Sequence, residues 1–440
     1  MRICTAAVGV FQLLGIAASA AVVPVSPTGG VEVALLPEAQ KRIMSFATNE
    51  ERAAAVRADG EKPKDERFYE KDRASKWRTS LPLNLKWRTT DGEEGPWKIL
   101  IGKTPDLSGA TEVWLNSKSA LKMTLTGTSK TGEEVEGKEH VYTYEMPCAN
   151  LEIGCTYYWK VWSNVACRRF PHGSTMYAGC PYCDGRRAVA SDVASFVTEA
   201  MPPRWIKLKG KVANVRDLGG WKTLDGRRTR QGMVFRGQGL NDGSVNGERP
   251  GPSRMMVDDV NYLRDELGIR TILDLRTDLE AGGMAESPLG PGVRLVHRAS
   301  PAYEGLFAVG DKAGGFNKYL CPDGKKAMAE NFRVFCDKAN YPIYFHCAGG
   351  ADRTGSLAYV LMGVLGVSRH DVEVEWETTF YPGLPEFAGD KSQWRSKQHF
   401  DEGFAGYGDA DTPLARRIEL YLLDCGVTQA EIDRFRSIML

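Results

Sequence analysis

The chain has 440 residues, of which 42% are hydrophobic and 26% charged, and 57 Lys and Arg against 56 Asp and Glu leave a formal net charge of +1. This balance is typical of a globular protein of two or three domains, and it excludes collagen-like, coiled-coil and wholly disordered chains. A near-neutral chain also lacks the broad basic field of nucleic-acid-binding proteins. No nucleic-acid partner is therefore expected, and any anion-binding site must be local.

The first twenty residues have the features of a secretory signal peptide. Arg2 provides a positive start, a short apolar stretch follows, and residues 18–20 form a small-x-small cleavage site. The alternative, a membrane anchor, is disfavoured because the apolar run falls short of the roughly 20 residues that a span needs. We therefore expect residues 1–20 to be removed, the rest to contain no membrane span, and the protein to be periplasmic or extracellular.

The segment before residue 200 divides into two parts. Residues 21–80 are expected to be an irregular, charge-rich lead, either a solvated helix or a linker. From 81 to 200 apolar and polar residues alternate, and short strands punctuated by turn residues predict a β-sandwich. The candidate strands are 81–87, 97–101, 157–162 and 194–198.

A tyrosine at a strand start sharpens the prediction for this β segment. Tyr157 follows the turn residue Gly154 by three positions, where its hydroxyl can bond back to the preceding corner. Together with the strand at 194–198, this segment resembles a fibronectin type III domain. The resemblance implies an all-β fold and leaves open whether the sandwich binds a partner.

Strands and helices alternate from residue 204 to 440, which predicts an α/β domain with helices packed on a sheet. Apolar residues at helical spacing between 256 and 267 predict a helix that ends at Gly268. Pro413 begins a later helix that ends at Gly426, and Thr428 with Glu431 forms a capping box for the last helix. The predicted fold class is thus multidomain, with an all-β sandwich followed by an α/β domain.

Residues 346–355, which read HCAGGADRTG, carry the most chemistry. An apolar strand precedes them and an apolar helix follows. The glycines let the backbone aim several N–H groups at one point, to which a helix N-terminus adds partial positive charge. Arg353 supplies a planar fork of donors, and Cys347 is expected as a thiolate below a site for a tetrahedral dianion. The alternative is a buried structural cysteine.

This loop resembles that of cysteine-dependent protein tyrosine phosphatases, in particular the bacterial dual-specificity and lipid-phosphatase-like branch. Residues 214–220 (NVRDLGG) and 272–276 (ILDLR) resemble two further signatures of that branch, in the same order. The resemblance implies a tyrosine-phosphatase-like domain over 204–440. It also implies hydrolysis of a phosphomonoester in two steps, without a metal or another cofactor.

The resemblance assigns roles to single residues. Cys347 would attack phosphorus and become a phosphocysteine, while Arg353 would bind the phosphoryl oxygens. The residues expected to bind phosphate are Ala348, Gly349, Gly350, Ala351, Asp352 and Arg353. Supporting roles are expected for His346, which would order the loop, for Thr354, which would bond the thiolate or help it leave, and for Arg216 and Asp217 of the first signature.

Two residues compete for the role of general acid. Asp352 is favoured because related bacterial enzymes carry Asp directly before the loop Arg. Glu304 is the alternative, since it is the only carboxylate in the loop after the 294–297 strand.

The substrate is the least defined part of the prediction. Related lipid-active loops carry Lys at the position of Ala351, so a phosphoprotein or a small phosphomonoester is favoured over a polyphosphoinositide. Inositol phosphates, as in cysteine phytases, are the alternative substrate. A phosphate-binding module without turnover is the alternative from another class, and the joint presence of Cys347, Asp352 and Arg353 argues against it.

Arginines and cysteines outside the loop leave alternatives open. Arg236, Arg276 and Arg298 each end a candidate strand and could surround the pocket, or Arg216, Arg236 and Arg276 could pair with Asp217 and Asp274 as scaffold. Cys180 and Cys183 are expected in a disulfide or in a cluster with Cys148, Cys155 and Cys167, with a zinc site or thiol–disulfide exchange as alternatives.

Overall fold

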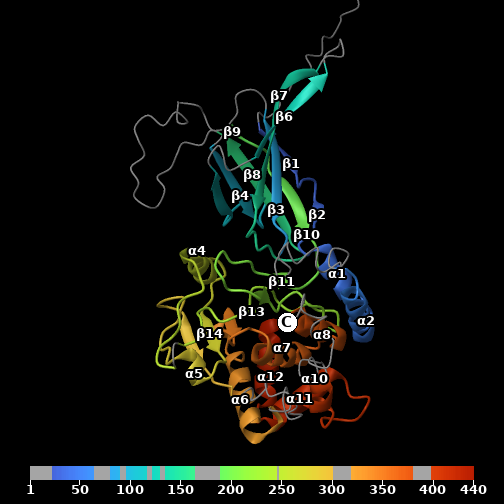
Figure 1. Cartoon of the computed structure of the whole chain (residues 1–440), viewed down its shortest axis with the longest axis vertical. Helices are drawn as coiled ribbons and strands as arrows, with labels where there is room; N and C mark the ends of the chain where they lie inside the picture. The colour runs from blue at the N-terminus through green and yellow to red at the C-terminus, as the bar shows by residue number, and fades with distance from the viewer. Residues whose placement is uncertain are drawn as a thin grey trace, which may run out of the picture. The chain divides into compact units, whose positions relative to one another are not determined.

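The computed structural model describes residues 22–63, 80–89, 96–115, 121–128, 134–163, 189–244, 247–300, 319–379 and 398–440. The chain divides into two compact units (Figure 1). The β unit comprises Met1–Val31, Asn84–Glu145 and Thr156–Phe196, and the α/β unit comprises Glu32–Leu83, Met146–Cys155 and Val197–Leu440. The predicted signal peptide lies outside the described residues.

The β unit is built of two sheets. The first has the strand order β1 (Val22–Ser26), β3 (Leu83–Thr89), β7 (Glu134–Met146), β6 (Leu121–Thr128). The second has the order β2 (Val31–Val33), β10 (Ala194–Thr198), β8 (Thr156–Ser163), β4 (Trp97–Gly102), β5 (Thr111–Leu115), with β9 (Val189–Ala190) paired to β8. The four predicted strands are therefore confirmed as β3, β4, β8 and β10.

Aromatic side chains join the two sheets. Trp87 on β3 and Trp97 on β4 meet edge to face with ring centroids 5.2 Å apart, and Tyr142 on β7 lies 4.6 Å from Trp97. Burial alternates strictly along β3, as expected for a strand with one face against a core. The two sheets thus face each other across an aromatic core.

The lead segment differs from its expected irregular form. It contains β1, β2 and two helices, α1 (Glu38–Met44) and α2 (Asn49–Gly60). From residue 32 onward it belongs to the α/β unit, where Leu36 and Met44 join the same hydrophobic core as Trp205. The apolar residues of this segment are interspersed with many charges, so the charge pattern alone suggested a solvated stretch. The predicted sandwich boundaries, 81–200, also enclose residues 146–155 and 197–200, which belong to the α/β unit.

A six-stranded sheet forms the centre of the α/β unit. Its order is β11 (Arg204–Trp205), β12 (Arg216–Asp217), β13 (Val234–Gly237), β16 (Ile343–His346), β14 (Thr271–Asp274), β15 (Arg294–His297). The last four strands are parallel, and β11 and β12 are antiparallel additions at one edge. Every residue of β13, β14 and β16 is buried, as expected for parallel strands covered on both faces.

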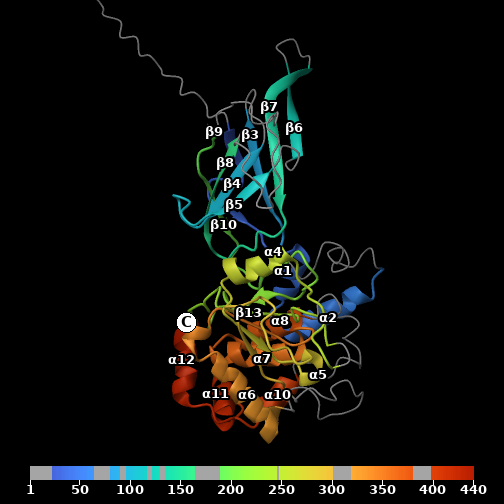
Figure 2. The same ribbon diagram turned by 90° about the vertical axis from the view of Figure 1, so that its left-hand side faces the viewer.

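Two hydrophobic cores lie on the two faces of this sheet. Phe345 belongs to the core of α6 (Pro322–Val334), α7 (Asp352–Val364), α11 (Leu414–Asp424) and α12 (Gln429–Met439), whereas Tyr344 belongs to the core of α4 (Val257–Asn261) and η1 (Tyr262–Glu266). Successive strand residues point to opposite faces. The other helices are α5 (Asp278–Ala281), η4 (Lys338–Asn340), α8 (Arg369–Thr378) and α10 (Gln398–Phe404). The two views show α4 apart from the group of α6, α7, α11 and α12 (Figure 2).

The predicted helix signals are confirmed near the C-terminus. α11 begins directly after Pro413 and ends before Gly426, and Thr428 and Glu431 form the capping box of α12. The helix expected between 256 and 267 is instead α4 followed by the π-helical turn η1, with Gly268 after it at a φ of +66°. Among the residues that the structure describes, no helix has the length and apolar character that crossing a bilayer would need.

Only two cysteines of the predicted cluster, Cys148 and Cys155, lie within the described residues. Sγ of Cys155 donates to the carbonyl of Ile153 at 3.5 Å, and Cys148 and Cys155 are not joined to each other. Cys167, Cys180 and Cys183 lie outside the described residues, and a pair between the last two stays a prediction. Within the described ranges, no group of three or more His, Cys, Asp or Glu side chains could hold a metal ion.

Candidate active site

Cys347 lies at the carboxyl end of the central parallel strands. β16 ends at His346, which pairs in register with Gly237 of β13 on one side and Asp274 of β14 on the other. The Cys347 thiol is 3% exposed, and the 13-residue helix α7 begins five residues later. In a parallel sheet this edge is where ligands bind, and the N-terminus of the following helix favours an anion there. We call residues 347–353 the Cys347 loop.

The two glycines of the Cys347 loop have different roles. Gly350 adopts a φ of +67°, and a Cβ at this position would collide with the backbone carbonyl of Gly237. Gly349 has no positive φ, and among the described residues no atom lies within 4 Å of where its Cβ would stand. The tight curve of the loop therefore requires glycine only at position 350.

The carbonyl of Gly350 is held from behind by two side chains. Asn214 Nδ2 donates to it at 3.0 Å and Arg236 Nη2 at 2.7 Å. Asn214 opens the first signature segment, 214–220, and Arg216 in turn donates to Asn214 Oδ1. The sequence signature and the loop, more than 130 residues apart in the chain, are thus joined by hydrogen bonds.

Asp217, the other residue expected from that signature, serves the sheet edge. Its carboxylate pairs with Arg204 of β11 at 3.0 Å and accepts the N–H groups of Gly219 and Gly232 at 2.7 and 2.6 Å. Burial raises the pKa of Asp217, opposed by these partners. Its bonds stabilise the turn and strand pair around β12, so it supports the site through the scaffold alone.

Arg353 is oriented by a carboxylate that sequence analysis missed. Its Nη1 and Nη2 atoms lie 2.5 and 2.7 Å from Oε2 and Oε1 of Glu280, and Nη1 also donates to the Leu275 carbonyl at 3.3 Å. Glu280 is itself fixed by a capping box with Thr277 at the start of α5. Burial lowers the pKa of Arg353, but the hydrogen bonds to Glu280 and the charges of Cys347 and Glu280 raise it above its ordinary value. In the sequence, the pattern Thr-x-x-Glu directly after residues 272–276 is a capping-box signature that could have drawn attention to Glu280.

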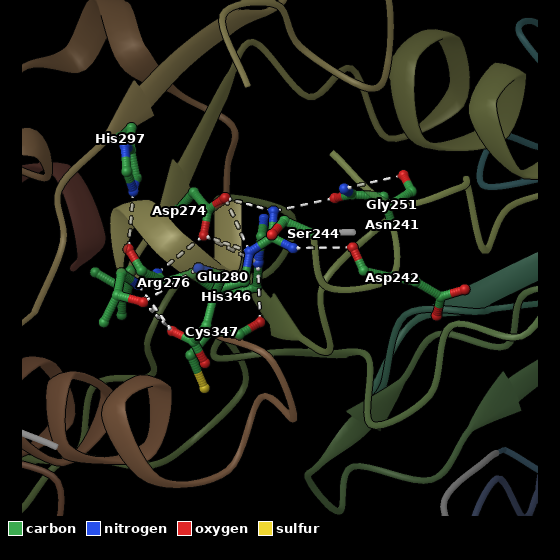
Figure 3. A network of polar contacts seen from close by, with 12 residues as sticks. Asn241, Asp242, Ser244, Gly251, Asp274, Arg276, Glu280, His297, His346 and Cys347 are labelled. Carbon is green, nitrogen blue, oxygen red and sulfur yellow. Dashed lines mark hydrogen bonds and ion pairs between the residues drawn. The ribbon is translucent and has the colours of Figure 1, made fainter. Parts of the chain in front are cut away.

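His346 is fully buried and lies beneath the nucleophile. Its Nδ1 is 3.0 Å from the Cys347 carbonyl oxygen and 3.6 Å from Asp274 Oδ1. Burial lowers the pKa of His346, although Asp274 opposes the shift. Figure 3 shows His346, Asp274 and Arg276 in one polar network, with the sulfur of Cys347 pointing away from it. This placement fits the predicted role of His346 in ordering the loop.

Comparison with known proteins agrees with this geometry. Residues 206–383 match the family model described as the tyrosine phosphatase family. The α/β unit therefore contains a region similar to the tyrosine phosphatase family, and we refer to this unit as the phosphatase domain. A Cupriavidus necator relative named as a tyrosine-protein phosphatase is 29% identical over 174 residues, which are 37% of this chain and 58% of the relative. The chain therefore spans less than two thirds of that curated relative.

Two solved structures are also similar to the phosphatase domain. One is the core catalytic domain of the PP-IP phosphatase SIW14 from S. cerevisiae in complex with citrate, at 14% identity, a TM-score of 0.22, and coverage of 36% of this chain and 82% of that chain. The other is the Siw14 catalytic core, at 17% identity, a TM-score of 0.22, and coverage of 36% and 90%.

The arginines at the strand ends do not surround the pocket of the phosphatase domain. β13, β14 and β15 are parallel as expected, but Arg236 pairs with Glu375 at 2.8 Å and Arg276 with Asp274 at 2.7 Å, and both are buried. Arg298 is exposed. The prediction that these arginines surround the pocket is therefore wrong. The alternative, in which they form salt bridges of the scaffold, is confirmed, although Arg236 pairs with Glu375 and not with one of the two predicted aspartates. A buried guanidinium needs a carboxylate at hydrogen-bond distance, and the tertiary fold supplies it.

The remaining predicted residues of the phosphatase domain lie at or near the loop. Asp352 is the half-buried first residue of α7, and Thr354 is buried with no hydrogen-bond partner for its hydroxyl among the described residues. Tyr319, which sequence analysis did not single out, hydrogen-bonds Ser300 at 3.1 Å. Burial raises the pKa of Tyr319, and the charges of Arg353, Cys347 and Asp352 also act on it. Glu304 lies outside the described residues.

Proposed function

We propose that this protein hydrolyses phosphomonoesters through a cysteinyl-phosphate intermediate, with phosphorylated protein side chains, foremost phosphotyrosine, as substrate. The observation that carries the proposal is the position of the buried Cys347 thiol. It is buried at the end of β16, directly before the turn into α7, and the guanidinium of Arg353 on α7 is already oriented by Glu280. A nucleophile and a preorganised oxyanion clamp are what phosphoryl transfer requires of a protein.

The first step transfers the phosphoryl group to sulfur. The Cys347 thiolate attacks phosphorus, the bond from phosphorus to the ester oxygen breaks, and Asp352 donates a proton to that leaving oxygen. Arg353 and the N–H groups of residues 348–353 bind the three other oxygens, on which charge builds up. Thr354 directly follows Arg353 in the chain, and its buried hydroxyl has no hydrogen-bond partner among the described residues, so we assign it to the thiolate.

The second step restores the enzyme. Water attacks phosphorus, the S–P bond breaks, and inorganic phosphate leaves with Cys347 again a thiolate. Asp352, now ionised, accepts the proton of the attacking water. Neither step calls for a metal ion or a redox cofactor.

Hydrolysis of a chromogenic aryl phosphate in the presence of a chelator tests the mechanism. Turnover should be blocked by orthovanadate and lost in Cys347→Ser, and trapped enzyme should carry phosphate on Cys347. A non-catalytic phosphate-binding module would bind vanadate without any turnover. Loss of turnover in Cys180→Ser but not in Cys347→Ser would show that the assignment of Cys347 as nucleophile is wrong.

Side-by-side assays on a phosphotyrosine peptide, a phosphoserine peptide and inositol phosphates test the substrate class. Ala351 in place of a loop lysine is the feature that favours peptides over highly charged inositol phosphates. A kcat/KM for inositol phosphates above that for both peptides would reassign the substrate.

The signal-like residues 1–20 and the two-sheet β unit complete the proposal. The protein is exported to the periplasm or the extracellular space, and its β unit is a fibronectin type III-like module that can offer a partner-binding surface. Sequencing of the mature N-terminus and cell fractionation test the export. A mature chain that begins at Met1 in the cytoplasmic fraction would contradict it.

A further inference from the structure

A buried polar network lies directly behind the Cys347 loop and is centred on Glu375 of α8. Glu375 is 1% exposed, and its Oε1 and Oε2 pair with Arg216 Nε at 2.6 Å and Arg236 Nη1 at 2.8 Å. Arg216 also donates to Thr379 Oγ1 at 2.7 Å. Two guanidinium groups thus share one carboxylate away from solvent, an arrangement whose stability depends on fixed geometry. We call these residues, together with Asn214, the Glu375 network.

Arg236 and Arg216 both connect Glu375 to the same atom of the Cys347 loop. Arg236 donates directly to the Gly350 carbonyl at 2.7 Å. Arg216 reaches the same carbonyl through Asn214, whose Nδ2 donates to it at 3.0 Å. A displacement of α8 would therefore move the side chains that hold the Gly350 carbonyl, and with them the Cys347 loop.

Helix α2 contacts α8 next to this network, although in the chain it lies between two segments of the β unit. Arg52 of α2 is fully buried, and its Nε lies 2.6 Å from Oε2 of Glu377, two residues beyond Glu375 on α8. α2 lies beside α8 in both views (Figures 1 and 2). A charge buried in this way stabilises the fold only while its partner is present, because removal of one partner leaves the other uncompensated.

Helix α1 is also linked to the Glu375 network, through Trp205. Gln40 of α1 is fully buried, and its Oε1 accepts a hydrogen bond from Trp205 Nε1 at 3.2 Å. The guanidinium of Arg216 lies 5.3 Å from the centre of the Trp205 ring, in cation–π geometry. Helix α1 therefore contacts Trp205, whose ring lies over the guanidinium of Arg216 in the network.

The start of α1 is held by Glu199, which follows the last strand of the β unit in the chain. Glu199 Oε1 accepts the N–H groups of Leu35 and Leu36, and its Oε2 pairs with Lys41 at 2.7 Å. The phosphatase unit is thus discontinuous in sequence, and residues 32–60 are fixed to it at their beginning, at Gln40 and at Arg52.

We propose that residues 32–60 are positioning elements of the phosphatase, in which Arg52 and Gln40 hold the Cys347 loop in its binding geometry through α8 and the Glu375 network. This goes beyond the proposed activity, because neither residue belongs to the Cys347 loop or to the residues expected to bind phosphate. Loss of the Arg52 contact leaves Glu377 unpaired and frees α8, so the Gly350 carbonyl loses its fixed donors. The loop then spends less time in the shape that binds a tetrahedral anion.

The test compares Arg52→Met with Arg42→Met in the full chain. Arg42 is an exposed arginine of the neighbouring helix α1 and serves as the matched control. Two properties are measured: amide hydrogen exchange in peptides that cover 347–353, and the dissociation constant of orthovanadate by calorimetry. Arg52→Met should raise both about tenfold, within the range that coupled positions reach, and Arg42→Met should leave both unchanged. Arg52→Lys, which retains a charge for Glu377, should recover part of the effect.

A double-mutant cycle locates the coupling. Arg52→Met and Glu375→Gln should be non-additive in vanadate affinity, because both act on the same loop anchor. Should Arg52→Met fail to fold, Gln40→Ala and Glu377→Gln test the same link with smaller perturbations. Arg52→Met with a lowered melting temperature but control-like exchange and vanadate affinity overturns the proposal. Since hydrogen exchange needs no turnover, this outcome is separate from any failure of the proposed hydrolysis.

Discussion

Arg353 and Glu280 face each other through two parallel hydrogen bonds, Nη1 to Oε2 at 2.5 Å and Nη2 to Oε1 at 2.7 Å. Glu280 is held in turn by the N–H and the hydroxyl of Thr277 at 2.8 and 3.1 Å. The guanidinium is therefore oriented before any anion arrives, which lowers the reorganisation that binding and reaction would otherwise require.

Replacing Glu280 should reduce catalysis more than stability. In Glu280→Ala the guanidinium of Arg353 loses both bonds, and kcat/KM should fall about 10- to 100-fold, as expected for a misplaced clamp. Aryl phosphate kinetics measure the effect, and Glu286→Gln, at an exposed acid five residues beyond α5, is the control. An unchanged kcat/KM in Glu280→Ala would show that the pair is dispensable.

The same pair should contribute a pH-dependent part of stability. Partial burial raises the pKa of Glu280, but the hydrogen bonds from Arg353 and Thr277 hold it below its ordinary value of 4.5. A lowered folded-state pKa gives stabilisation that is complete above pH 4.5 and disappears as the pH falls through the folded pKa. The melting-temperature difference between wild type and Glu280→Gln should therefore shrink in acid. A difference that stays constant from neutral pH into this acidic range would contradict the assignment.

The two loop glycines should respond differently to alanine. Gly350→Ala should be destabilised by more than the roughly 1–2 kcal/mol of a left-handed alanine, because the new Cβ also collides with Gly237. Gly349→Ala meets open space and should retain its melting temperature. Thermal unfolding of the two variants measures the contrast. Equal losses would mean that the loop does not have the described curve.

Cysteine alkylation should single out the nucleophile. Burial raises the pKa of Cys336 and that of Cys425 to about 12, so both remain protonated and react slowly with iodoacetamide at neutral pH. Modification of Cys347 should parallel the loss of activity, and orthovanadate should protect that residue, as peptide mass spectrometry would show. Inactivation that tracks Cys336 or Cys425 instead would refute the assignment of the nucleophile.

Leaving-group dependence should identify the general acid. Asp352→Asn should lower kcat strongly for an alkyl phosphate, whose leaving oxygen needs a proton, and much less for a nitrophenyl phosphate. Glu304→Gln is the matched variant at the competing position. The opposite result, with Glu304→Gln showing the leaving-group effect, would move the role of general acid to Glu304.

The sequence was sufficient for features that depend on neighbouring residues. The alternation of apolar and polar residues predicted β3, β4, β8 and β10, and the capping signals located α11 and α12. The pattern of residues 346–355 placed a thiol between a strand and a helix. These features follow from local geometry and hydrophobic periodicity, which the linear chain carries directly.

Only the tertiary structure decided which charges meet. Glu280 and Arg353 are 73 residues apart, Glu375 and Arg216 are 159 apart, and Arg52 and Glu377 are 325 apart. No local pattern relates such residues, because ion pairing is set by how strands and helices stack after collapse. Burial then makes the pairing obligatory, and for this reason arginines expected around the pocket became scaffold, and a charged segment expected in solvent became part of the phosphatase domain.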